Sequence, residues 1–438
     1  VCCADSLGTG RRAVLQPSRP SEEQMRLAYC LRAVFPQHGY GGLERSGTDL
    51  MRHLLMQGVD IDLFTRPLPE GHPLRQDGFP GRLCVHALEY DKLPLKPNGI
   101  PARLTNYRAF VEAAGRRVRG LAREGLVQAI YAHGLFAWGV HRASEWGLPM
   151  VANPHGLEEF KTPDPLKRLA YAPMRAWVRA GCRAADRVIA TDNSMKQEVA
   201  RLLGLPVGRV VVVRNGIDLA VLRAYSSPLM MSELIMRYPV LGEAGRFRGI
   251  SVGRMEGNKG FDVLLKALAR ATASLGEQWT WVLVGEGSLR PELQRLASEL
   301  GIGDNVLFPG EVSDEELHNL YELVDVFAHP SLYEGSSLVT LEAMAHRLPV
   351  VASAVGGIPD KVEQGESGFL VEPGDVDALA NKIGWMAASP DRLPTMGAAG
   401  AGIAASFDWP LIARQTAALL EGLVSERLAC STGVPPRA

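Results

Sequence analysis

The chain has 438 residues, of which 46% are hydrophobic and 22% are charged; this is a globular composition, and the length favours two domains over one. The formal charge is −1, but residues 1–220 carry 30 Lys and Arg against 21 Asp and Glu, whereas residues 221–438 carry 17 against 27. No nucleic-acid motif accompanies the dispersed basic residues, so we expect no nucleic-acid partner. An anionic acceptor or membrane surface facing the first half fits better, the alternative being a solvated surface without a partner.

Residues 1–24 are rich in Arg, Ser, Gly and Pro and lack both periodicity and the apolar segment of a secretory signal, which predicts a disordered leader. No apolar run approaches the roughly 20 residues of a membrane-spanning helix. The six cysteines are scattered without a C-x-x-C pair, so neither a zinc site nor a disulfide framework is indicated. We therefore expect a cytoplasmic protein, and the inner face of the cytoplasmic membrane is the surface on which it would dock.

From Met25 onward, short apolar runs alternate with helical patterns, which predicts βαβ units and parallel sheets. The first series of strand candidates is LAYCLRAVF, DIDLFT, VQAIYAH, PMVANP, RVIAT and RVVVV; the second is GISVGR, WTWVLVG, NVLFPG, DVFAHP, PVVAS and GFLVEP. Each series predicts one doubly wound α/β domain, the first over 25–218 and the second over 247–407. The stretch 219–246 has no strand pattern and would hold the connection. Ligands of such sheets bind outside the C-terminal strand ends, so we expect the site in a cleft between the domains.

Two pairs of candidate residues follow strands of the first domain. Gly41 and Gly42 lie between the first strand and an amphipathic helix, where glycine permits close approach of the backbone to a ligand. This is not a G-x-G-x-x-G pattern, so a dinucleotide site is only weakly indicated. His133 and His155 each end a strand and precede glycine, which places both near the cleft, although either could simply cap a turn.

Two D-x-D strings suggest a divalent metal at first sight. Asp60 and Asp62 lie within a predicted strand, with both carboxylates on one face. Asp375 and Asp377 follow Pro-Gly at a helix start, where Asp is an ordinary cap. We assign no metal.

Two stretches of the first domain, 102–125 and 166–187, are basic and partly amphipathic. Helices with Arg on one face and aromatic residues on the other can lie on anionic membranes. Ordinary surface helices have the same pattern, so the sequence leaves both interpretations open.

In the second domain a strand ends at Arg254, and a helix with an apolar stripe begins near Phe261. Lys259 therefore stands at a helix N-terminus, where the helix dipole opposes a cation by roughly 0.3–1 kcal/mol unless an anion is bound between them. Arg254 could complete a clamp on a diphosphate. The alternative is a pair of exposed surface cations.

The stretch DVFAHPSLYEGSSLVTLEAMA has the same organisation of strand, loop and helix. Ser336 or Ser337 is predicted to cap the helix. Glu334 then stands in the loop and Glu342 about one turn inside the helix, so that their carboxylates can accept hydrogen bonds from different sugar hydroxyls of one extended ligand, while the helix amides bind phosphate oxygens. For Glu342 alone, an acidic residue near a helix start is also favourable by itself.

Taken together, the loops resemble the family-4 retaining glycosyltransferases. The motifs are G-G near the start, P-H-G in mid-domain, N-G-I-D at 215–218, G-R-x4-K-G at 253–260, E-x7-E at 334–342, and later G-G-I-P with G-F-L-V-E-P-G-D. The resemblance covers about residues 25–427 and implies a GT-B fold, in which two doubly wound Rossmann-like domains face each other across a cleft. It also implies that a helix at about 408–427 returns to the first domain, before a flexible tail at 428–438.

The resemblance further implies a role for each matching residue. The implied catalytic residues are His155, Arg254, Lys259 and Glu334. The implied donor-binding residues are Gly41, Gly42, Arg254, Lys259, Glu334, Gly335, Ser336, Ser337, Leu338, Val339 and Glu342. In this scheme the two cations hold the donor diphosphate, the second carboxylate binds the ribose and the first binds the transferred sugar. The two serines occupy positions that vary among relatives, so the identity of the sugar stays open.

The implied reaction moves a hexose from a nucleotide-diphosphate sugar to a glycan or lipid-linked acceptor, in cell-envelope or extracellular polysaccharide biosynthesis. The departing phosphate helps to deprotonate the acceptor, so neither a separate base nor a metal nor another cofactor is expected. Two alternatives remain at this point. A non-hydrolysing nucleotide-sugar epimerase has the same GT-B architecture, but the combination of E-x7-E with G-R-x4-K-G favours the transferase. A catalytically inactive nucleotide-sugar-binding module is disfavoured because the expected charged residues are all present.

Overall fold

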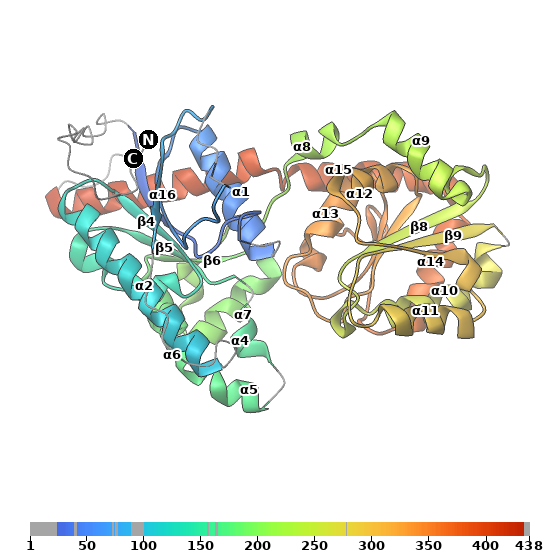
Figure 1. Ribbon diagram of the computed structural model, residues 1–438, viewed down its shortest axis with the longest axis horizontal. Coiled ribbons are helices and arrows are strands. Elements are labelled where there is room, and N and C mark those ends of the chain that lie inside the picture. The colour runs from blue at the N-terminus through green and yellow to red at the C-terminus, as the bar shows by residue number, and fades with distance from the viewer. Residues whose placement is uncertain are drawn as a thin grey trace. The chain divides into compact units, whose positions relative to one another are not determined.

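The computed structural model describes residues 24–38, 42–71, 74, 78–88, 100–155, 157–162, 165–276 and 278–432. Apart from Gln24, the predicted leader lies outside the described residues. The chain divides into two compact units (Figure 1). The first comprises residues 1–191, 196–213 and 412–438, and the second comprises residues 192–195 and 214–411.

The first unit is built on a seven-stranded parallel sheet of order β3-β2-β1-β4-β5-β6-β7. Its strands are β1 Arg26–Cys30, β2 Asp60–Thr65, β3 Leu83–Ala87, β4 Ala129–His133, β5 Met150–Asn153, β6 Arg187–Ala190 and β7 Val210–Val212. Every strand predicted for this domain is present. The strand that was not predicted, β3, lies at the edge of the sheet and is only partly buried, so its sequence LCVHA lacks a strong apolar run.

Helices cover this sheet because alternate strand residues on each face are apolar. They are α1 Gly42–Met56, α2 Ile100–Arg123, α3 Phe136–Gly139, η1 Ala143–Trp146, α4 Glu158–Lys161, α5 Pro165–Ala170, α6 Ala172–Ala184, α7 Asn193–Leu203 and η2 Val207–Arg209. One face of the sheet packs against α2, α6 and α7 in a continuous core. On the other face, the hydroxyl of Tyr29 in β1 donates to the carbonyl oxygen of Gly47 in α1.

The second unit is built on a six-stranded parallel sheet of order β10-β9-β8-β11-β12-β13. Its strands are β8 Phe247–Val252, β9 Trp279–Val284, β10 Val306–Gly310, β11 Val326–His329, β12 Val350–Ser353 and β13 Gly368–Val371. The six strands predicted for the second domain are confirmed, and with them the predicted α/β class of two parallel sheets.

Two layers of helices cover the second sheet. One face packs against α10 Phe261–Leu275, α11 Arg290–Glu299 and α14 Val376–Ala387. The other face packs against α8 Leu219–Ala224, α9 Pro228–Arg237, α12 Asp314–Glu322 and α13 Leu338–Ala345. The remaining elements are η3 Pro239–Gly242, η4 Gly257–Lys259, η5 Gly303–Asn305, η6 Ile358–Asp360, η7 Pro390–Arg392 and α15 Leu393–Ala405.

Two stretches differ from the prediction. The stretch 219–246, expected to be a connection, folds as α8, α9 and η3, and it clusters with the second unit because Leu222, Leu234 and Leu241 are buried in its core. The last helix, α16, runs over Trp409–Thr432, and its residues from Ile412 onward belong to the first unit. The flexible tail expected at 428–438 is therefore wrong for 428–432, which continue the helix; residues 433–438 lie outside the described part of the chain.

Both sheets reverse their winding direction at one place. The strand orders put β1 beside β4 in the first unit and β8 beside β11 in the second. In doubly wound sheets, ligands bind beyond the carboxyl ends of the strands at such a switch point. The loops after β8 and β11 are therefore where a ligand of the second unit is expected.

Within the residues that the structure describes, no helix is both long enough and apolar enough to cross a membrane.

Candidate active site

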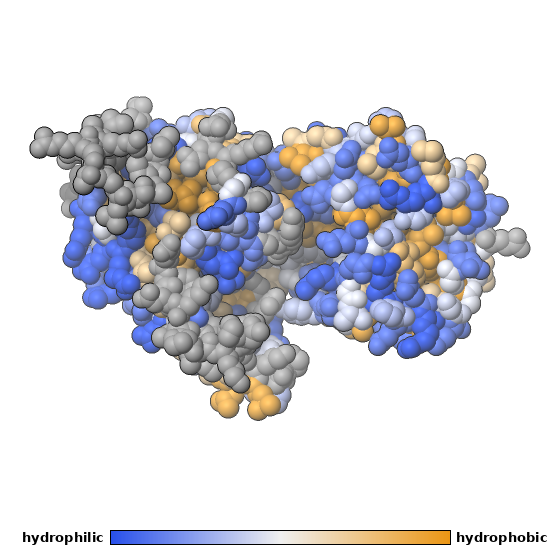
Figure 2. Space-filling view, viewed as in Figure 1, coloured by the Kyte–Doolittle hydropathy of each residue, from blue (hydrophilic) through white to orange (hydrophobic). Residues whose placement is uncertain are grey.

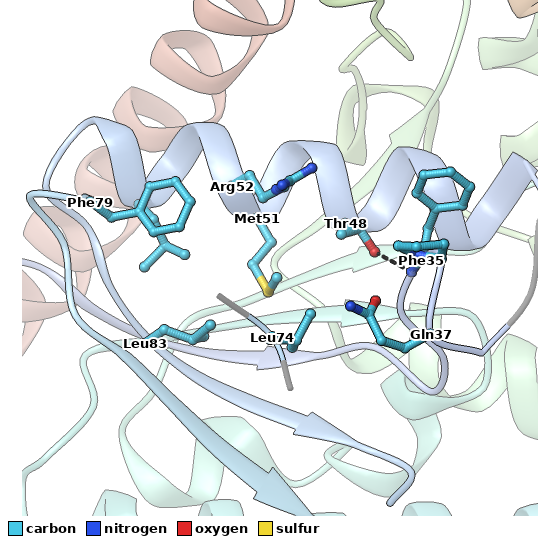
Figure 3. A pocket seen from close by; sticks show the side chains of 10 residues that line it. Phe35, Gln37, Thr48, Met51, Arg52, Leu74, Phe79 and Leu83 are labelled. Carbon is cyan, nitrogen blue, oxygen red and sulfur yellow. Dashed lines mark hydrogen bonds between the residues drawn. The ribbon is translucent and has the colours of Figure 1, made fainter. Parts of the chain in front are cut away.

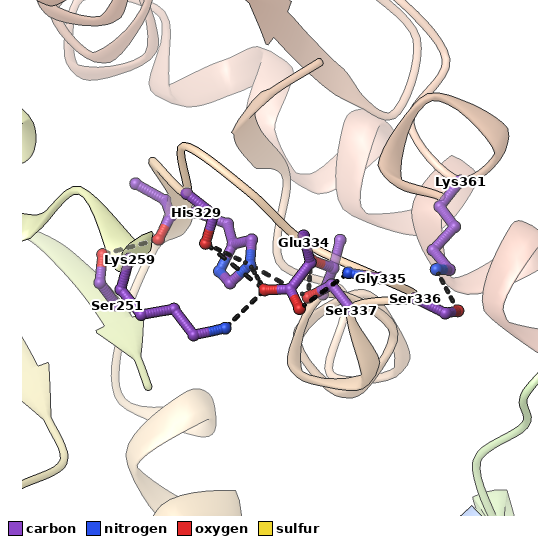
Figure 4. A network of polar contacts seen from close by, with 11 residues as sticks. Ser251, Lys259, His329, Glu334, Gly335, Ser336, Ser337 and Lys361 are labelled. Atoms are coloured by element: carbon purple, nitrogen blue, oxygen red, sulfur yellow. Dashed lines mark hydrogen bonds and ion pairs between the residues drawn. The ribbon is translucent and has the colours of Figure 1, made fainter. Parts of the chain in front are cut away.

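The site of the second unit is formed by two loops, 253–260 after β8 and 330–337 after β11 (Figure 4). The loops are fastened together by their backbones, since the amide of Leu332 donates to the carbonyl oxygen of Asn258 at 2.8 Å. Gly260 has a φ of +65°, and a Cβ placed on it would lie 2.2 Å from the carbonyl oxygen of Pro330. Glycine is therefore required where the loops touch.

This fastening brings Lys259 and Glu334 together. The ammonium nitrogen of Lys259 lies 2.5 Å from Oε2 of Glu334, and each side chain is 16% exposed. Lys259 ends η4, two residues before α10 begins at Phe261, so it stands next to the helix N-terminus as the sequence predicted. The structure thus joins two residues that are separated by 75 positions in the chain.

His329, at the end of β11, is a member of the site that sequence reasoning missed. Its Nε2 lies 3.1 Å from Oε2 of Glu334, 3.1 Å from the hydroxyl of Ser331 and 3.2 Å from the hydroxyl of Ser337. The available signal was its position, because it ends a strand just as His133 does. Burial lowers the pKa of His329, and its hydrogen bond to Glu334 acts in the opposite direction.

Glu334 is held in its charged form. Burial alone would raise the pKa of its carboxyl group, but the hydrogen bond from His329 and the charge of Lys259 outweigh burial and lower the pKa to about 2. A carboxylate that stays ionised over the physiological pH range is an acceptor and not a donor. It is therefore suited to receive hydrogen bonds from sugar hydroxyls.

Arg254 complements this pair. It follows β8 by two residues, its side chain is exposed, and its guanidinium makes no hydrogen bond or ion pair with any residue that the structure describes. An arginine presents several N–H donors in a plane and binds phosphate groups in bidentate fashion. The site therefore offers one exposed cation and one cation paired with a carboxylate.

The start of α13 lies in the same loop system. Ser337 occupies the N-cap position, but its hydroxyl makes no capping bond. That hydroxyl instead contacts Nε2 of His329 and accepts a hydrogen bond from Thr340 at 2.9 Å. The predicted cap is thus correct in position and wrong in its hydrogen bond. Because no capping side chain satisfies them, the amides that begin the helix at Leu338 and Val339 can bind an anion.

Glu342 lies further along α13 and is only 5% exposed. Its carboxylate is therefore not one of the exposed acidic groups that complement a helix dipole from the surface. Its binding of a ribose stays a prediction.

The G-G-I-P motif packs against the backbone of the loop after β11. The amide of Gly357 donates to the carbonyl oxygen of Gly335 at 2.8 Å. Gly356 has a φ of +55°, and a Cβ on it would lie 2.3 Å from the carbonyl oxygen of Glu334. The motif therefore allows the backbone at Glu334 and Gly335 to pack without an intervening side chain.

In the first unit, His133 and His155 form a stacked pair. Nδ1 of His133 lies 2.7 Å from Nε2 of His155, and the ring centroids are 5.0 Å apart. Burial lowers the pKa of His155 to about 4 and that of His133 well below its ordinary value, so both rings are neutral at pH 7. Gly42 begins α1, whereas Gly41 lies outside the described residues.

The D-x-D strings have other partners. Asp62 forms an ion pair with Arg26 at 2.6 Å and a hydrogen bond with His86 at 2.7 Å, and Asp375 caps α14 by accepting from the amide of Ala378. Asp62, Cys84 and His86 do place possible ligand atoms within 4.8 Å of one another. The guanidinium of Arg26 on the same carboxylate opposes a divalent cation there, so we do not assign a metal site to this cluster.

The first unit also contains a cavity of about 260 Å³ between α1, β3 and the loop after β1 (Figure 3). Its wall is formed by Phe35, Pro36, Gln37, Thr48, Met51, Arg52, Leu55, Leu74, Phe79 and Leu83. Most of these side chains are apolar, which suits the apolar part of a ligand better than a diphosphate. None of the predicted site residues lines it.

Comparison with known proteins agrees with these features. Residues 40–221 match the family described as Glycosyltransferase Family 4, and residues 243–401 match the family described as Glycosyl transferases group 1. A D-inositol 3-phosphate glycosyltransferase of Streptomyces scabiei is 31% identical over 398 residues, which cover 86% of this chain and 85% of that protein.

Solved structures show the same fold. Sucrose-phosphate synthase from Thermosynechococcus elongatus superposes with a TM-score of 0.71 at 25% identity, over 92% of this chain and all of that chain. Anabaena Alr3699/HepE in complex with UDP-glucose superposes with a TM-score of 0.64 at 24% identity, over 91% of this chain and all of that one. The relatives thus extend over both units and favour a glycosyltransferase over the epimerase. The chain belongs to the family-4 retaining glycosyltransferases and has the GT-B fold.

Proposed function

We propose that this enzyme transfers a hexose from a uridine-diphosphate sugar to a hydroxyl group of an anionic acceptor. The observation that carries the proposal is the contact of Lys259 with Glu334 at the switch point of the second sheet, beside the exposed Arg254. Two cations suit a diphosphate and an ionised carboxylate suits sugar hydroxyls. The site therefore has a complement for each half of a nucleotide sugar.

In the proposed mechanism, Arg254, Lys259 and the first amides of α13 bind the donor diphosphate, while Glu342 binds the ribose. The bond between the anomeric carbon and the diphosphate oxygen breaks, and the acceptor oxygen bonds to that carbon on the same face. The acceptor proton passes to the departing phosphate, so no separate base is needed. Fixed positive groups then stabilise the charge that develops on the leaving diphosphate.

Glu334 and His155 are each proposed to act on the transferred sugar. Glu334 accepts hydrogen bonds from the transferred sugar, with His329 holding its carboxylate in place. His155 is assigned beside the reacting sugar, and its neutral ring can donate or accept one hydrogen bond there. No metal or other cofactor takes part in this scheme.

The base of the donor is proposed from a structural relative. Alr3699/HepE was crystallised with UDP-glucose, and its chain superposes on 91% of this one. That likeness supports uridine as the base and leaves the hexose open.

The proposed acceptor is anionic because residues 1–220 carry an excess of basic residues. Two acceptors of this kind have support. D-inositol 3-phosphate is supported by relatives that are 28–31% identical and are named D-inositol 3-phosphate glycosyltransferases. A lipid-linked glycan phosphate is favoured instead by the apolar cavity of the first unit, which suits a hydrocarbon segment.

Contact with an anionic membrane is proposed for α5 only. The aromatic residues that were expected to face a membrane are directed inward, since Phe110 of α2 is buried and Trp177 of α6 packs against the core. In α5, however, Leu166 is 78% exposed and Leu169 is 75% exposed. Figure 2 shows hydrophobic side chains at the lower end of the molecule, where α5 lies in Figure 1.

Vesicle sedimentation tests this contact. Phosphatidylglycerol vesicles at low salt should bind the protein and release it at high salt, because the attraction to anionic lipid is screened. The double variant Leu166→Ser/Leu169→Ser should bind less. Failure of the unmodified protein to sediment at low salt would remove the proposal.

A panel of donors and acceptors tests the reaction itself. The protein is incubated with UDP-, GDP- and ADP-linked hexoses, alone and with D-inositol 3-phosphate or a polyprenyl-diphosphate-linked sugar, and nucleotide release and product configuration are measured. We expect release of UDP that requires an acceptor, with retained anomeric configuration. Conversion of the donor without acceptor, or binding without turnover, would contradict the proposed function.

A further inference from the structure

Lys361 and Asp192 form a buried polar pair beneath Ser336 in the loop after β11. Both side chains of the pair are 0% exposed, and Nζ of Lys361 lies 3.4 Å from Oδ1 of Asp192. Asp192 belongs to the second unit by its contacts. The same Nζ donates a hydrogen bond of 2.9 Å to the hydroxyl oxygen of Ser336, as Figure 4 shows.

A fully buried lysine needs an explanation, because removing an ammonium group from water is unfavourable. Burial lowers the pKa of Lys361, and Asp192 counteracts this by raising it. The surroundings are shaped for the pair, since a Cβ on Gly357 would lie 2.2 Å from Cγ of Asp192. An apolar side chain could have filled this space without needing a buried partner such as Asp192. Packing alone therefore does not account for a lysine at this position.

The geometry determines the direction of the hydrogen bonds at Ser336. An ammonium group has only donors, so the hydroxyl oxygen of Ser336 must accept from Lys361. The hydrogen of that hydroxyl is then directed elsewhere. The acceptor nearest to it is Oδ1 of Asp192, at 3.4 Å, which is long for a hydrogen bond between oxygens. Because Ser336 is only half-buried, its O–H can instead donate to an oxygen of a bound ligand.

We infer that Ser336 selects the sugar of the donor by donating a hydrogen bond to one of its hydroxyl oxygens, and that Lys361 is a positioning residue that orients Ser336. This inference rests on the proposed function and adds to it the residue that recognises a hydroxyl group of the hexose. Ser336 stands two positions after Glu334, which is assigned to the transferred sugar, and directly before the N-cap of α13. We assign Ser336 to the sugar because of its place beside Glu334, and the binding of free UDP tests whether it acts on the diphosphate instead.

A double-mutant cycle tests the inference. Ser336→Ala, Lys361→Met and the combined variant are compared with the unmodified enzyme by kcat/KM for the nucleotide sugar and by the dissociation constant of free UDP. Each single substitution should lower kcat/KM about tenfold, the effect of one lost hydrogen bond. Lys361→Met should cause no further loss in the Ser336→Ala background, because it acts through that hydroxyl. Ser336→Thr, which keeps the hydroxyl, should restore most of the activity.

Folding is controlled separately. Lys361→Met leaves Asp192 buried without its cation, so Lys361→Met/Asp192→Asn serves as a second variant without that unpaired charge. It should fold and still show the tenfold loss.

Three outcomes would overturn the inference. Additive losses in the cycle would mean that Lys361 has a merely structural role, and an equal weakening of UDP binding would place the contact on the nucleotide. If the unmodified protein turns over no nucleotide sugar, this result contradicts the proposed function itself. Normal turnover with an unaffected Ser336→Ala variant is the failure of this inference alone.

Discussion

Lys259 and Glu334 stabilise each other in the absence of substrate, and this has a consequence for catalysis. Each side chain is 16% exposed, so their attraction is screened less than that of a surface pair. In the proposed scheme a bound diphosphate replaces Glu334 as the partner of Lys259, and Glu334 keeps its hydrogen bond from His329, which measures 3.1 Å in the structure. We therefore expect the pair to hold both groups in place until the donor binds.

Lys259→Ala should lower kcat at least about tenfold without unfolding the protein, because it removes a positive group from the leaving diphosphate. The measurement is steady-state turnover of the nucleotide sugar, with circular dichroism as a check of folding. Lys266→Ala is the matched control, since Lys266 pairs with Asp262 on the surface of α10 and should leave the rate unchanged. An unaltered kcat for Lys259→Ala would refute the assignment.

The histidine pair of the first unit predicts a loss of stability in acid. The pKa of His155 is lowered to about 4 in the folded state, whereas an unfolded histidine titrates near 6.5. Below about pH 6.5 the unfolded chain therefore binds a proton at this histidine that the folded chain does not bind. The free energy of unfolding consequently falls as the pH is lowered to about 4. The shift corresponds to roughly 3 kcal/mol.

Denaturant unfolding between pH 7 and pH 4 measures this loss. His155→Gln should reduce the slope of stability against pH over that range, since it removes one of the two groups that must gain a proton. The same slope in the variant and the unmodified protein would contradict the assignment of the lowered pKa.

At the scale of elements, the site depends on how closely two loops approach. Gly260 carries the contact between them, with a φ of +65° and no room for a Cβ beside the carbonyl oxygen of Pro330. Gly260→Ala should move Lys259 away from Glu334. A displacement of about 1 Å can cost up to 100-fold in rate, so we expect kcat/KM to fall about 10- to 100-fold.

Gly402→Ala is the control for that substitution. Gly402 is exposed in α15 and has no atom within 4 Å of the added Cβ, so this variant should be as active as the unmodified enzyme and at least as stable. Equal activity of Gly260→Ala and Gly402→Ala would show that the loop contact does not position the site.

The elements themselves were largely predictable, because buried parallel strands are short apolar runs that are visible in the sequence. The exceptions have physical causes. The edge strand β3 is half-exposed and therefore lacks such a run. The stretch 219–246 has no strand pattern and was expected to be a connection, but it folds as helices that pack on the second unit. Ser337 was placed correctly at a helix start, but its hydroxyl bonds to His329, a partner that local sequence does not reveal.

The site was predictable to the same degree. Motif order placed Arg254, Lys259 and Glu334 in loops after two strands, and the parallel sheet puts those strands side by side. The partners of Glu334 and Ser336 were not predictable, because they depend on which buried side chains the fold brings beneath the loop. His329 and Lys361 carry no motif of their own and became visible only through their contacts.

At the scale of the whole molecule, α16 belongs to both units. Its first residues cluster with the second unit and its residues from Ile412 with the first. There Leu420 is 0% exposed, and Arg427 pairs with Asp186 at 2.8 Å. The C-terminal helix is therefore part of the core of a domain that begins some four hundred residues earlier.

Leu420→Ala should lower the free energy of unfolding of the first unit by about 2–5 kcal/mol, because it leaves a cavity in the core. Hydrogen exchange measured by mass spectrometry resolves the two units, and the peptides of the first unit should lose protection. Leu428→Ala, at a position that is 60% exposed, should leave protection unchanged. Unaltered protection in the Leu420→Ala variant would show that the helix end is dispensable for the first unit.

A crystal structure of the enzyme with UDP-glucose would show whether the second unit binds the donor diphosphate. We expect diphosphate oxygens within about 2.7–3.2 Å of Nζ of Lys259, of the guanidinium of Arg254 and of the first amides of α13, with Glu334 facing the glucose. Density for the diphosphate at any other place on the protein would contradict this expectation.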